Sequence, residues 1–158
     1  MKYLITLFLL LLGACSTTPP DVAKPAAPRH IDDSMNNLAI YAMSLYDTPY
    51  QYGGTSRTNG CDCSGFVQYV YQNSLGLQLP RTSVEMSRIG TPLAEGDLKP
   101  GDLVFFNTSH TPYSHVGIFV GDNRFVHSPK RGKAIMLGRL SDKYWRAHYD
   151  GARRIALK

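Results

Sequence analysis

Two hydrophobic periodicities divide the chain, and their order limits the folds that it can adopt. Up to about residue 89, apolar residues recur at helical spacing in three segments, 33–46, 62–75 and 82–89. The first is expected to be capped by Asp33 or Ser34, and the third by a Thr82/Glu85 capping box. After residue 100, short apolar runs predict strands at 103–106, 115–120, 124–127, 134–137 and 153–157. This order indicates an α+β domain in which N-terminal helices pack on a small antiparallel β-sheet.

The N-terminal segment differs in composition from the rest of the chain. Residues 3–12 form a ten-residue apolar run, about half of the roughly 20 residues that a membrane-spanning helix needs. We therefore expect residues 1–14 to be a cleaved export signal. The segment LGAC at 12–15 resembles a bacterial lipobox, in which cleavage falls before the cysteine, and it implies acylation of Cys15. Ser16 follows where an aspartate would favour the inner membrane, so the outer membrane, on its periplasmic side, is the expected location. The alternative is an ordinary signal peptide in which the cysteine occurs by chance.

Residues 15–31 contain four prolines among small and polar residues, which predicts an extended tether. Residues 32–158 are then enough for one domain with a hydrophobic core. The formal net charge of the whole chain is +5, with the basic residues spread along it. This mild excess suits an anionic polymer. Nucleic acid is not an expected partner, because the sequence has neither a clustered basic segment nor a known nucleic-acid-binding module.

The two remaining cysteines, Cys61 and Cys63, call for a chemical explanation. They are two residues apart, which makes a disulfide between them geometrically awkward. Asp62 is expected to cap the second helix and Gly76 to stop it, which places Cys63 in the first turn, on the apolar face that also carries Phe66. A helix N-terminus offers a positive dipole end and free amides, which favour a thiolate and can hold an oxyanion. Cys63 is therefore the candidate nucleophile, with its thiol toward the interior or a cleft floor.

Two histidines on neighbouring strands are candidates for the partner base. His115 opens one predicted strand and His127 ends the next. If residues 121–123 form the connecting loop, His127 lies opposite Gly117 and on the same face as His115. Diagonal neighbours of this kind are about 7–8 Å apart at Cα, so the two imidazoles would touch. A two-residue loop without a bulge would instead place them on opposite faces of the sheet.

Four segments together resemble a known family. They are DCSGFV at 62–67, GDLVFF at 101–106, HVGI at 115–118 and FVH at 125–127. In this order, they resemble the NlpC/P60 family of cell-wall cysteine peptidases over residues 41–155. With Cys15 and the tether included, the chain is similar to the small Gram-negative lipoproteins of that family. The resemblance implies a reduced papain-like α+β domain, with the cysteine helix packed on a small antiparallel sheet.

The resemblance also implies roles for individual residues. Cys63 would be the nucleophile, His115 the general base and later acid, and His127 the residue that orients His115. Tyr50 would lie beside the oxyanion and Asp62 near the substrate's amino group. Ser64 and Arg81 complete the expected substrate-binding set. The implied substrates are peptidoglycan peptide stems, with the D-alanyl–diaminopimelate cross-link favoured over the γ-D-glutamyl–diaminopimelate bond. No metal or cofactor is implied, and protein regulators are not predicted.

Alternatives remain at this stage. Cys61 stands where the family usually has a plain apolar residue, so it either fills that position as a small apolar group or exerts redox control with Cys63. Cys61, Cys63, His115 and His127 could form a zinc site, although their spacing is tight for one. A catalytically silent wall-binding lipoprotein, or a thiol amidase or acyltransferase acting on lipids, would keep the fold. His148, beside Trp145 and Tyr149, is assigned to packing or surface.

Overall fold

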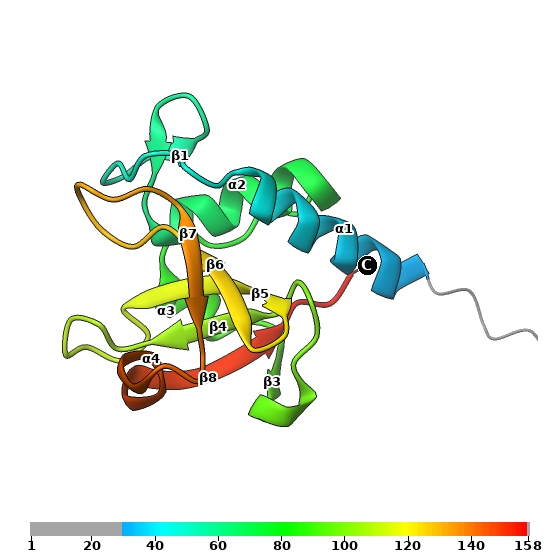
Figure 1. The fold of residues 1–158 in the computed structure, drawn as a ribbon. Helices are drawn as coiled ribbons and strands as arrows, with labels where there is room; N and C mark the ends of the chain where they lie inside the picture. The colour runs from blue at the N-terminus through cyan, green and yellow to red at the C-terminus, as the bar shows by residue number, and fades with distance from the viewer. Residues whose placement is uncertain (1–29, 158) are drawn as a thin grey trace, which may run out of the picture.

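The computed structural model describes residues 30–157, and its helices and sheet form two layers (Figure 1). Helices α1 (His30–Ser44) and α2 (Cys63–Leu75) pack together and against β5 (His115–Gly121). The short helix α3 (Ser83–Met86) follows α2. The predicted export signal, Cys15 and most of the tether lie outside the described residues. Among residues 30–157, no helix has the length and apolarity needed to cross a bilayer.

The helix ends follow local capping chemistry, with one correction at the N-terminus. Helix α1 begins at His30, so it includes the last two residues of the predicted tether, and Asp33 lies in its first turn rather than at its cap. Acidic side chains in a first turn are stabilised by the helix dipole, which explains why the helix continues back past them. Asp62 caps α2 and Gly76 ends it in a left-handed conformation, as predicted. Thr82 and Glu85 form the predicted capping box of α3.

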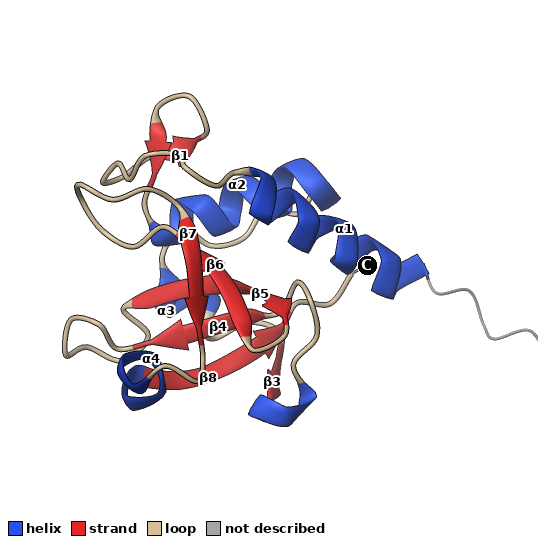
Figure 2. Cartoon of the chain, in the orientation of Figure 1, coloured by secondary structure: helices blue, strands red, loops and turns tan. Residues whose placement is uncertain are grey.

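Within residues 30–157, six strands form one antiparallel sheet in the order β3-β8-β4-β5-β6-β7 (Figure 2). The strands are β3 (Thr91–Leu93), β4 (Leu103–Phe106), β5, β6 (Arg124–His127), β7 (Met136–Arg139) and β8 (Tyr149–Arg154). A second, two-stranded sheet pairs β1 (Thr55–Ser56) with β2 (Gly60–Cys61). The α+β prediction is confirmed.

Two predicted strands are displaced and several short elements were not predicted. Strand β7 begins two residues later than predicted, and β8 begins at residue 149, four residues before the predicted 153. Strand β7 follows a loop and β8 directly follows α4 (Lys143–His148), so their bounds depend on pairing with β6 and β4 rather than on local pattern. The unpredicted elements are β1, β2, β3, the 3₁₀ turn η1 (Glu95–Asp97) and helix α4 (Lys143–His148), each of six residues or fewer.

The sheet buries both of its faces. Alternate residues of β4 enter two different apolar clusters: Leu103 and Phe105 join the core under α1 and α2, whereas Val104 and Phe106 join a second cluster. Trp145 of α4 packs on this second cluster. Side chains that alternate along β5 and β6 therefore also point either toward α2 or toward the α4 side.

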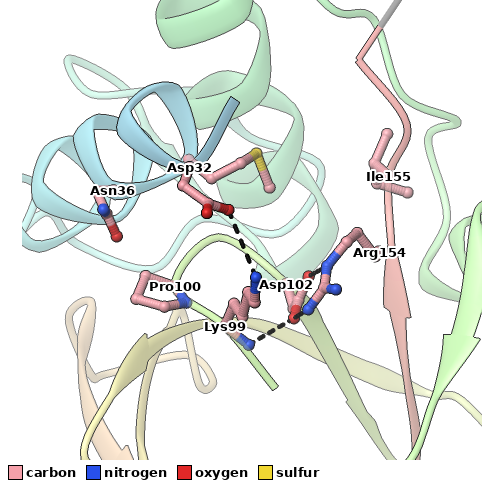
Figure 3. A pocket seen from close by; sticks show the side chains of 8 residues that line it. Asp32, Asn36, Lys99, Pro100, Asp102, Arg154 and Ile155 are labelled. Carbon is pink, nitrogen blue, oxygen red and sulfur yellow. Dashed lines mark hydrogen bonds and ion pairs between the residues drawn. The ribbon is translucent and has the colours of Figure 1, made fainter. Parts of the chain in front are cut away.

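A polar cluster ties the ends of these elements together on the side where α1 begins (Figure 3). Asp102 is fully buried and accepts hydrogen bonds from the Arg154 guanidinium, at 2.6 and 2.9 Å, and from the Lys99 amide at 2.7 Å. The Lys99 ammonium lies 3.7 Å from Asp32 of α1. These contacts join three parts of the chain, which are α1, β8 and the turn that precedes β4. They surround a cavity of about 260 Å³.

Candidate active site

The start of α2 holds Cys63 against the loop that precedes it. The Asp62 side chain accepts a hydrogen bond from the Gly65 amide at 2.7 Å, and its other oxygen accepts one from the Gly53 amide at 2.9 Å. A side chain at position 65 would meet the Gly54 carbonyl, since a Cβ built there lies 2.0 Å from that oxygen. Gly65 therefore allows the loop to pack directly on the first turn of α2, beside the thiol.

A cleft of about 450 Å³ opens at this point. Its lining includes Cys63 and four other predicted site residues, Tyr50, Asp62, Ser64 and Arg81. Tyr52 and Ser114, which were not predicted, also line it. The structure thus brings together residues from α2, from the loops on either side of it and from the turn before β5.

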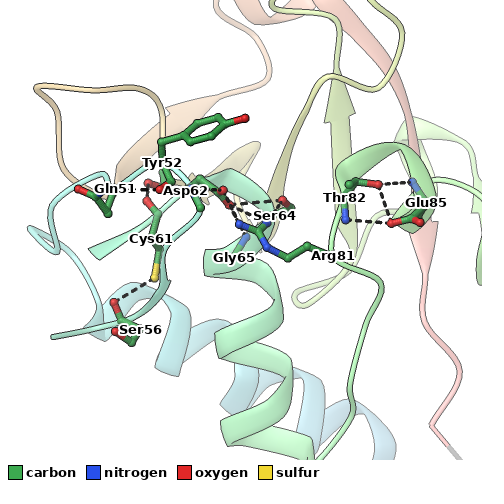
Figure 4. Close-up of polar contacts among 12 residues, drawn as sticks. Gln51, Tyr52, Ser56, Cys61, Asp62, Ser64, Gly65, Arg81, Thr82 and Glu85 are labelled. Carbon is green, nitrogen blue, oxygen red and sulfur yellow. Dashed lines mark hydrogen bonds and ion pairs between the residues drawn. The ribbon is translucent and has the colours of Figure 1, made fainter. Parts of the chain in front are cut away.

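Arg81 forms the polar centre of the cleft with Asp62 and Ser64 (Figure 4). Its guanidinium donates to both Asp62 carboxylate oxygens, at 2.5 and 3.0 Å, and to the Ser64 hydroxyl at 2.8 Å. Burial raises the pKa of Asp62, but the hydrogen bonds from Arg81 and from the Gly65 and Gly53 amides outweigh it and lower that pKa overall. Asp62 is therefore a carboxylate at neutral pH, and the cleft carries a fixed ion pair.

The electrostatics of Cys63 differ from the sequence prediction. Burial raises the pKa of the Cys63 thiol, and the Asp62 charge adds to this, whereas hydrogen bonds from the Val116, Ser64 and Cys63 amides oppose it. The net shift is upward, so the predicted lowering by the helix terminus is wrong for the resting protein. Desolvation outweighs the three amides because the sulfur lies inside the domain. The same amides are the candidate donors to an oxyanion formed by attack of this sulfur.

Tyr50 lines the same cleft as the Cys63 thiol. Burial raises the pKa of its hydroxyl, with further upward contributions from Cys63 and Asp62, so the group is neutral and able to donate a hydrogen bond. The backbone around Tyr50 is held by an isolated β-bridge to Cys61 of β2. It is also held by a hydrogen bond from the Tyr50 amide to the Lys133 carbonyl.

The histidine pair forms in the predicted register. Ile118 pairs with Val126, which sets His127 opposite Gly117. The turn itself has only two residues, Asp122 and Asn123, both with positive φ. A bulge between Phe119 and Gly121 restores the same-face arrangement that a two-residue turn alone would prevent. The Nε2 atom of His115 lies 2.8 Å from Nδ1 of His127, and both rings are buried.

Trp145 encloses this histidine pair and was not identified from the sequence. Its ring stacks on His115 with centroids 5.8 Å apart, and meets His127 edge-on at 4.9 Å. Burial lowers the pKa of His115 to about 4. Burial and the neighbouring His115 lower the pKa of His127 to about 3. Both imidazoles are therefore neutral at pH 7, each with one donor and one acceptor nitrogen.

The family of the chain follows from comparison with known proteins. The sequence model of the NlpC/P60 family matches residues 47–154. The chain belongs to the NlpC/P60 family. All the predicted site residues except Cys15 lie within the matched range.

Relatives and solved structures agree with this assignment. "Murein DD-endopeptidase MepH" of Escherichia coli K12 is 39% identical over 146 residues, covering 90% of this chain and 52% of MepH. "Probable endopeptidase NlpC" of the same organism is 39% identical over 158 residues, covering 96% of this chain and 97% of NlpC. A lipoprotein-like NLP/P60 protein of Staphylococcus aureus Mu50 has a crystal structure with a TM-score of 0.71 and 32% identity, covering 87% of this chain and 45% of that one. This chain spans about half the length of MepH.

Cys61 occupies a buried position in this NlpC/P60 domain. It is fully buried, burial raises its pKa to about 11, and its thiol donates to the Ser56 carbonyl at 3.3 Å. Cys61 and Cys63 are both free thiols. These features support Cys61 as a small apolar filler rather than a redox partner, because a buried, protonated thiol is a poor nucleophile for exchange.

The zinc alternative finds no support in the side-chain geometry. Among residues 30–157, no group of three His, Cys, Asp or Glu side chains is placed to share a metal ion. His115 and His127 direct ring nitrogens at each other, and the Cys61 thiol points at the Ser56 carbonyl. The half-buried His148 ring stacks on Tyr144 and bonds the Tyr144 carbonyl, which agrees with its predicted packing or surface role.

Proposed function

We propose that this NlpC/P60 chain is a cysteine endopeptidase that hydrolyses amide bonds in the peptide stems of peptidoglycan. The observation that carries the proposal is the buried His115–His127 pair, joined at 2.8 Å, on two strands that contact α2, the helix whose first turn holds Cys63. The Val116 amide, which directly follows His115, lowers the pKa of the Cys63 thiol, so the thiol lies near the start of β5, the strand that carries the imidazole. The endopeptidase names of MepH and NlpC support the same class of reaction.

The first half of the reaction begins from a neutral thiol and a neutral imidazole. The Nε2 atom of His115 is engaged with His127, which leaves Nδ1 to take the thiol proton as the Cys63 sulfur attacks the amide carbonyl carbon. His127 accepts from the Nε2–H and so holds His115 in the tautomer that this step needs. The amides around Cys63 and the Tyr50 hydroxyl stabilise the oxyanion.

The second half returns the site to its starting state. The carbon–nitrogen bond breaks, and His115 gives its proton to the leaving amine, which leaves a thioester on Cys63. His115 then removes a proton from water as the water oxygen attacks the thioester carbonyl. The thioester bond breaks, the stem leaves as a carboxylic acid, and the sulfur recovers its proton.

The favoured scissile bond is the D-alanyl–diaminopimelate cross-link. The name of MepH, a murein DD-endopeptidase with 39% identity to this chain, supports this choice. The γ-D-glutamyl–diaminopimelate bond is the second candidate. The two bonds differ in what cleavage releases, because the first separates joined stems and the second shortens a stem.

Digestion of purified, cross-linked muropeptides by the purified protein, with products identified by mass, tests the proposal. Monomers with intact stems are expected, and shortened stems would assign the γ-D-glutamyl bond instead. Protein treated with iodoacetamide is the control. Alkylation is expected at Cys63, which lines the cleft, and not at the fully buried Cys61. An untreated protein that leaves both bonds intact would contradict the proposal and favour a silent wall-binding lipoprotein.

We further propose that Cys15 carries the lipid that anchors the protein in the outer membrane, as the LGAC segment and Ser16 suggest. Cells fed labelled palmitate should incorporate the label into the wild-type chain and not into a Cys15→Ala variant. The wild-type protein is expected in the outer-membrane fraction, and the variant outside it. Equal labelling of both chains would contradict this proposal.

A further inference from the structure

A second cavity has a volume of about 370 Å³. Its lining includes His115, Lys130, Tyr144 and Trp145. Ser114 lines the first cleft and His115 lines the second cavity, so the two linings include residues that are consecutive in the chain. The nucleophile Cys63 therefore lines the first cleft, and the general base His115 lines the second cavity. A peptide whose scissile bond lies at Cys63 would extend into both.

The chemistry of the reaction assigns a direction to that peptide. His115 protonates the leaving amine, so the residue that bears this amine must lie on the His115 side. The part of the substrate that bears the scissile carbonyl then lies in the first cleft, which contains Cys63 and the Asp62–Arg81 pair. The second cavity is thus placed to receive the part of the substrate that departs with the new amine.

One wall of the second cavity is aromatic. Trp145 packs on both imidazoles, and Tyr144 meets Trp145 edge-on with ring centroids 5.0 Å apart. The Tyr144 ring is 51% exposed. An exposed ring beside a catalytic imidazole offers apolar surface to the carbon chain of a bound residue.

Lys130 adds positive charge to the lining of the same cavity. Lys130 lies in the loop between β6 and β7, and no carboxylate among residues 30–157 lies within ion-pair distance of it. By contrast, Arg81 and Arg154 at other cavities are each paired with a buried aspartate. Lys130 therefore adds an uncompensated ammonium to the cavity, and the group that complements it is an anion.

We propose that this second cavity is a substrate subsite for an amine-bearing residue with a free carboxylate next to its acylated nitrogen, and that Lys130 pairs with this carboxylate. Tyr144 and Trp145 pack on the carbon chain of the same residue. The inference rests on the proposed peptidase function, and it specifies which substrates that activity prefers.

Two substrates that differ in one group test the inference. Both contain the scissile amide; the carboxylate next to the acylated nitrogen is free in one and a carboxamide in the other. The wild-type protein is expected to cleave the free acid with a kcat/KM about fivefold higher, the magnitude of one exposed ion pair. Lys130→Gln should remove this preference, mainly by raising KM for the free acid. Lys143→Gln, at an exposed lysine of α4 outside the cavity lining, is the charge-matched control and should keep the preference.

The possible failures are distinguishable. If Lys130→Gln discriminates as well as the wild type, the subsite is wrong and the peptidase function stands. If Lys143→Gln loses the preference as fully as Lys130→Gln, the effect is one of overall charge and the subsite is overturned. If the wild-type protein cleaves neither substrate, the peptidase function fails and the subsite fails with it.

Discussion

Replacing Cys63 by alanine is expected to lower kcat on a cross-linked muropeptide by roughly 10⁴-fold or more, because the substitution removes the sulfur that forms the thioester. The fold should survive, since the Asp62 cap and its bonds to Gly65, Gly53 and Arg81 do not involve the sulfur. The measurement is single-turnover cleavage with enzyme in excess, followed by mass. Thermal unfolding of the same preparations checks that the variant is folded.

Cys61→Ala is the matched control for this experiment. Cys61 lies two residues away and is fully buried, but its thiol bonds only the Ser56 carbonyl. This variant is therefore expected to keep most of the activity while losing some stability. A Cys63→Ala protein that retained more than about 1% of wild-type kcat would contradict the assignment, since loss of a nucleophile is not compensated by binding alone. Loss of activity in Cys61→Ala alone would revive the redox hypothesis.

Short-range signals explain which parts of the fold were predictable. Caps act within four residues, so Asp62 and Gly76 locate both ends of α2, and Thr82 with Glu85 locates the start of α3. The histidine pair was predictable for a related reason. Strand alternation and the length of one turn determine which face each imidazole occupies, and a bulge supplied the extra residue that the prediction had placed in the turn.

Long-range packing explains what the sequence did not show. Strand β3 is short, contains Pro92 and pairs only with β8 at the edge of the sheet, so it lacks a pattern of its own. Helix α4 has six residues, too few for a visible periodicity. The role of Trp145 depends on where α4 docks. The raised pKa of the Cys63 thiol likewise depends on burial, which no motif encodes.

The buried histidine pair is expected to make the protein markedly less stable in acid. An unfolded histidine has a pKa near 6.5, whereas burial lowers the pKa of His115 to about 4 and that of His127 to about 3 in the folded domain. Between these values, the unfolded chain binds more protons than the folded one, so the free energy of unfolding falls as the pH falls from about 6.5 toward 4. The expected loss from pH 7 to pH 4.5 is roughly 2–3 kcal/mol per imidazole. That is a large fraction of the total stability of a typical domain.

Urea denaturation of the wild-type protein and of a His115→Gln/His127→Gln variant at pH 7 and pH 4.5 measures this effect. The variant cannot take up these two protons, so its free energy of unfolding should change much less between the two pH values. His110→Gln, at an exposed loop residue, controls for the loss of a surface imidazole. Asp62 contributes in the same direction but mainly at lower pH, because its folded pKa is lowered from 3.8. Equal pH dependence in the wild type and the double variant would mean that the pair is protonated in the folded protein, and therefore that Trp145 does not keep it neutral.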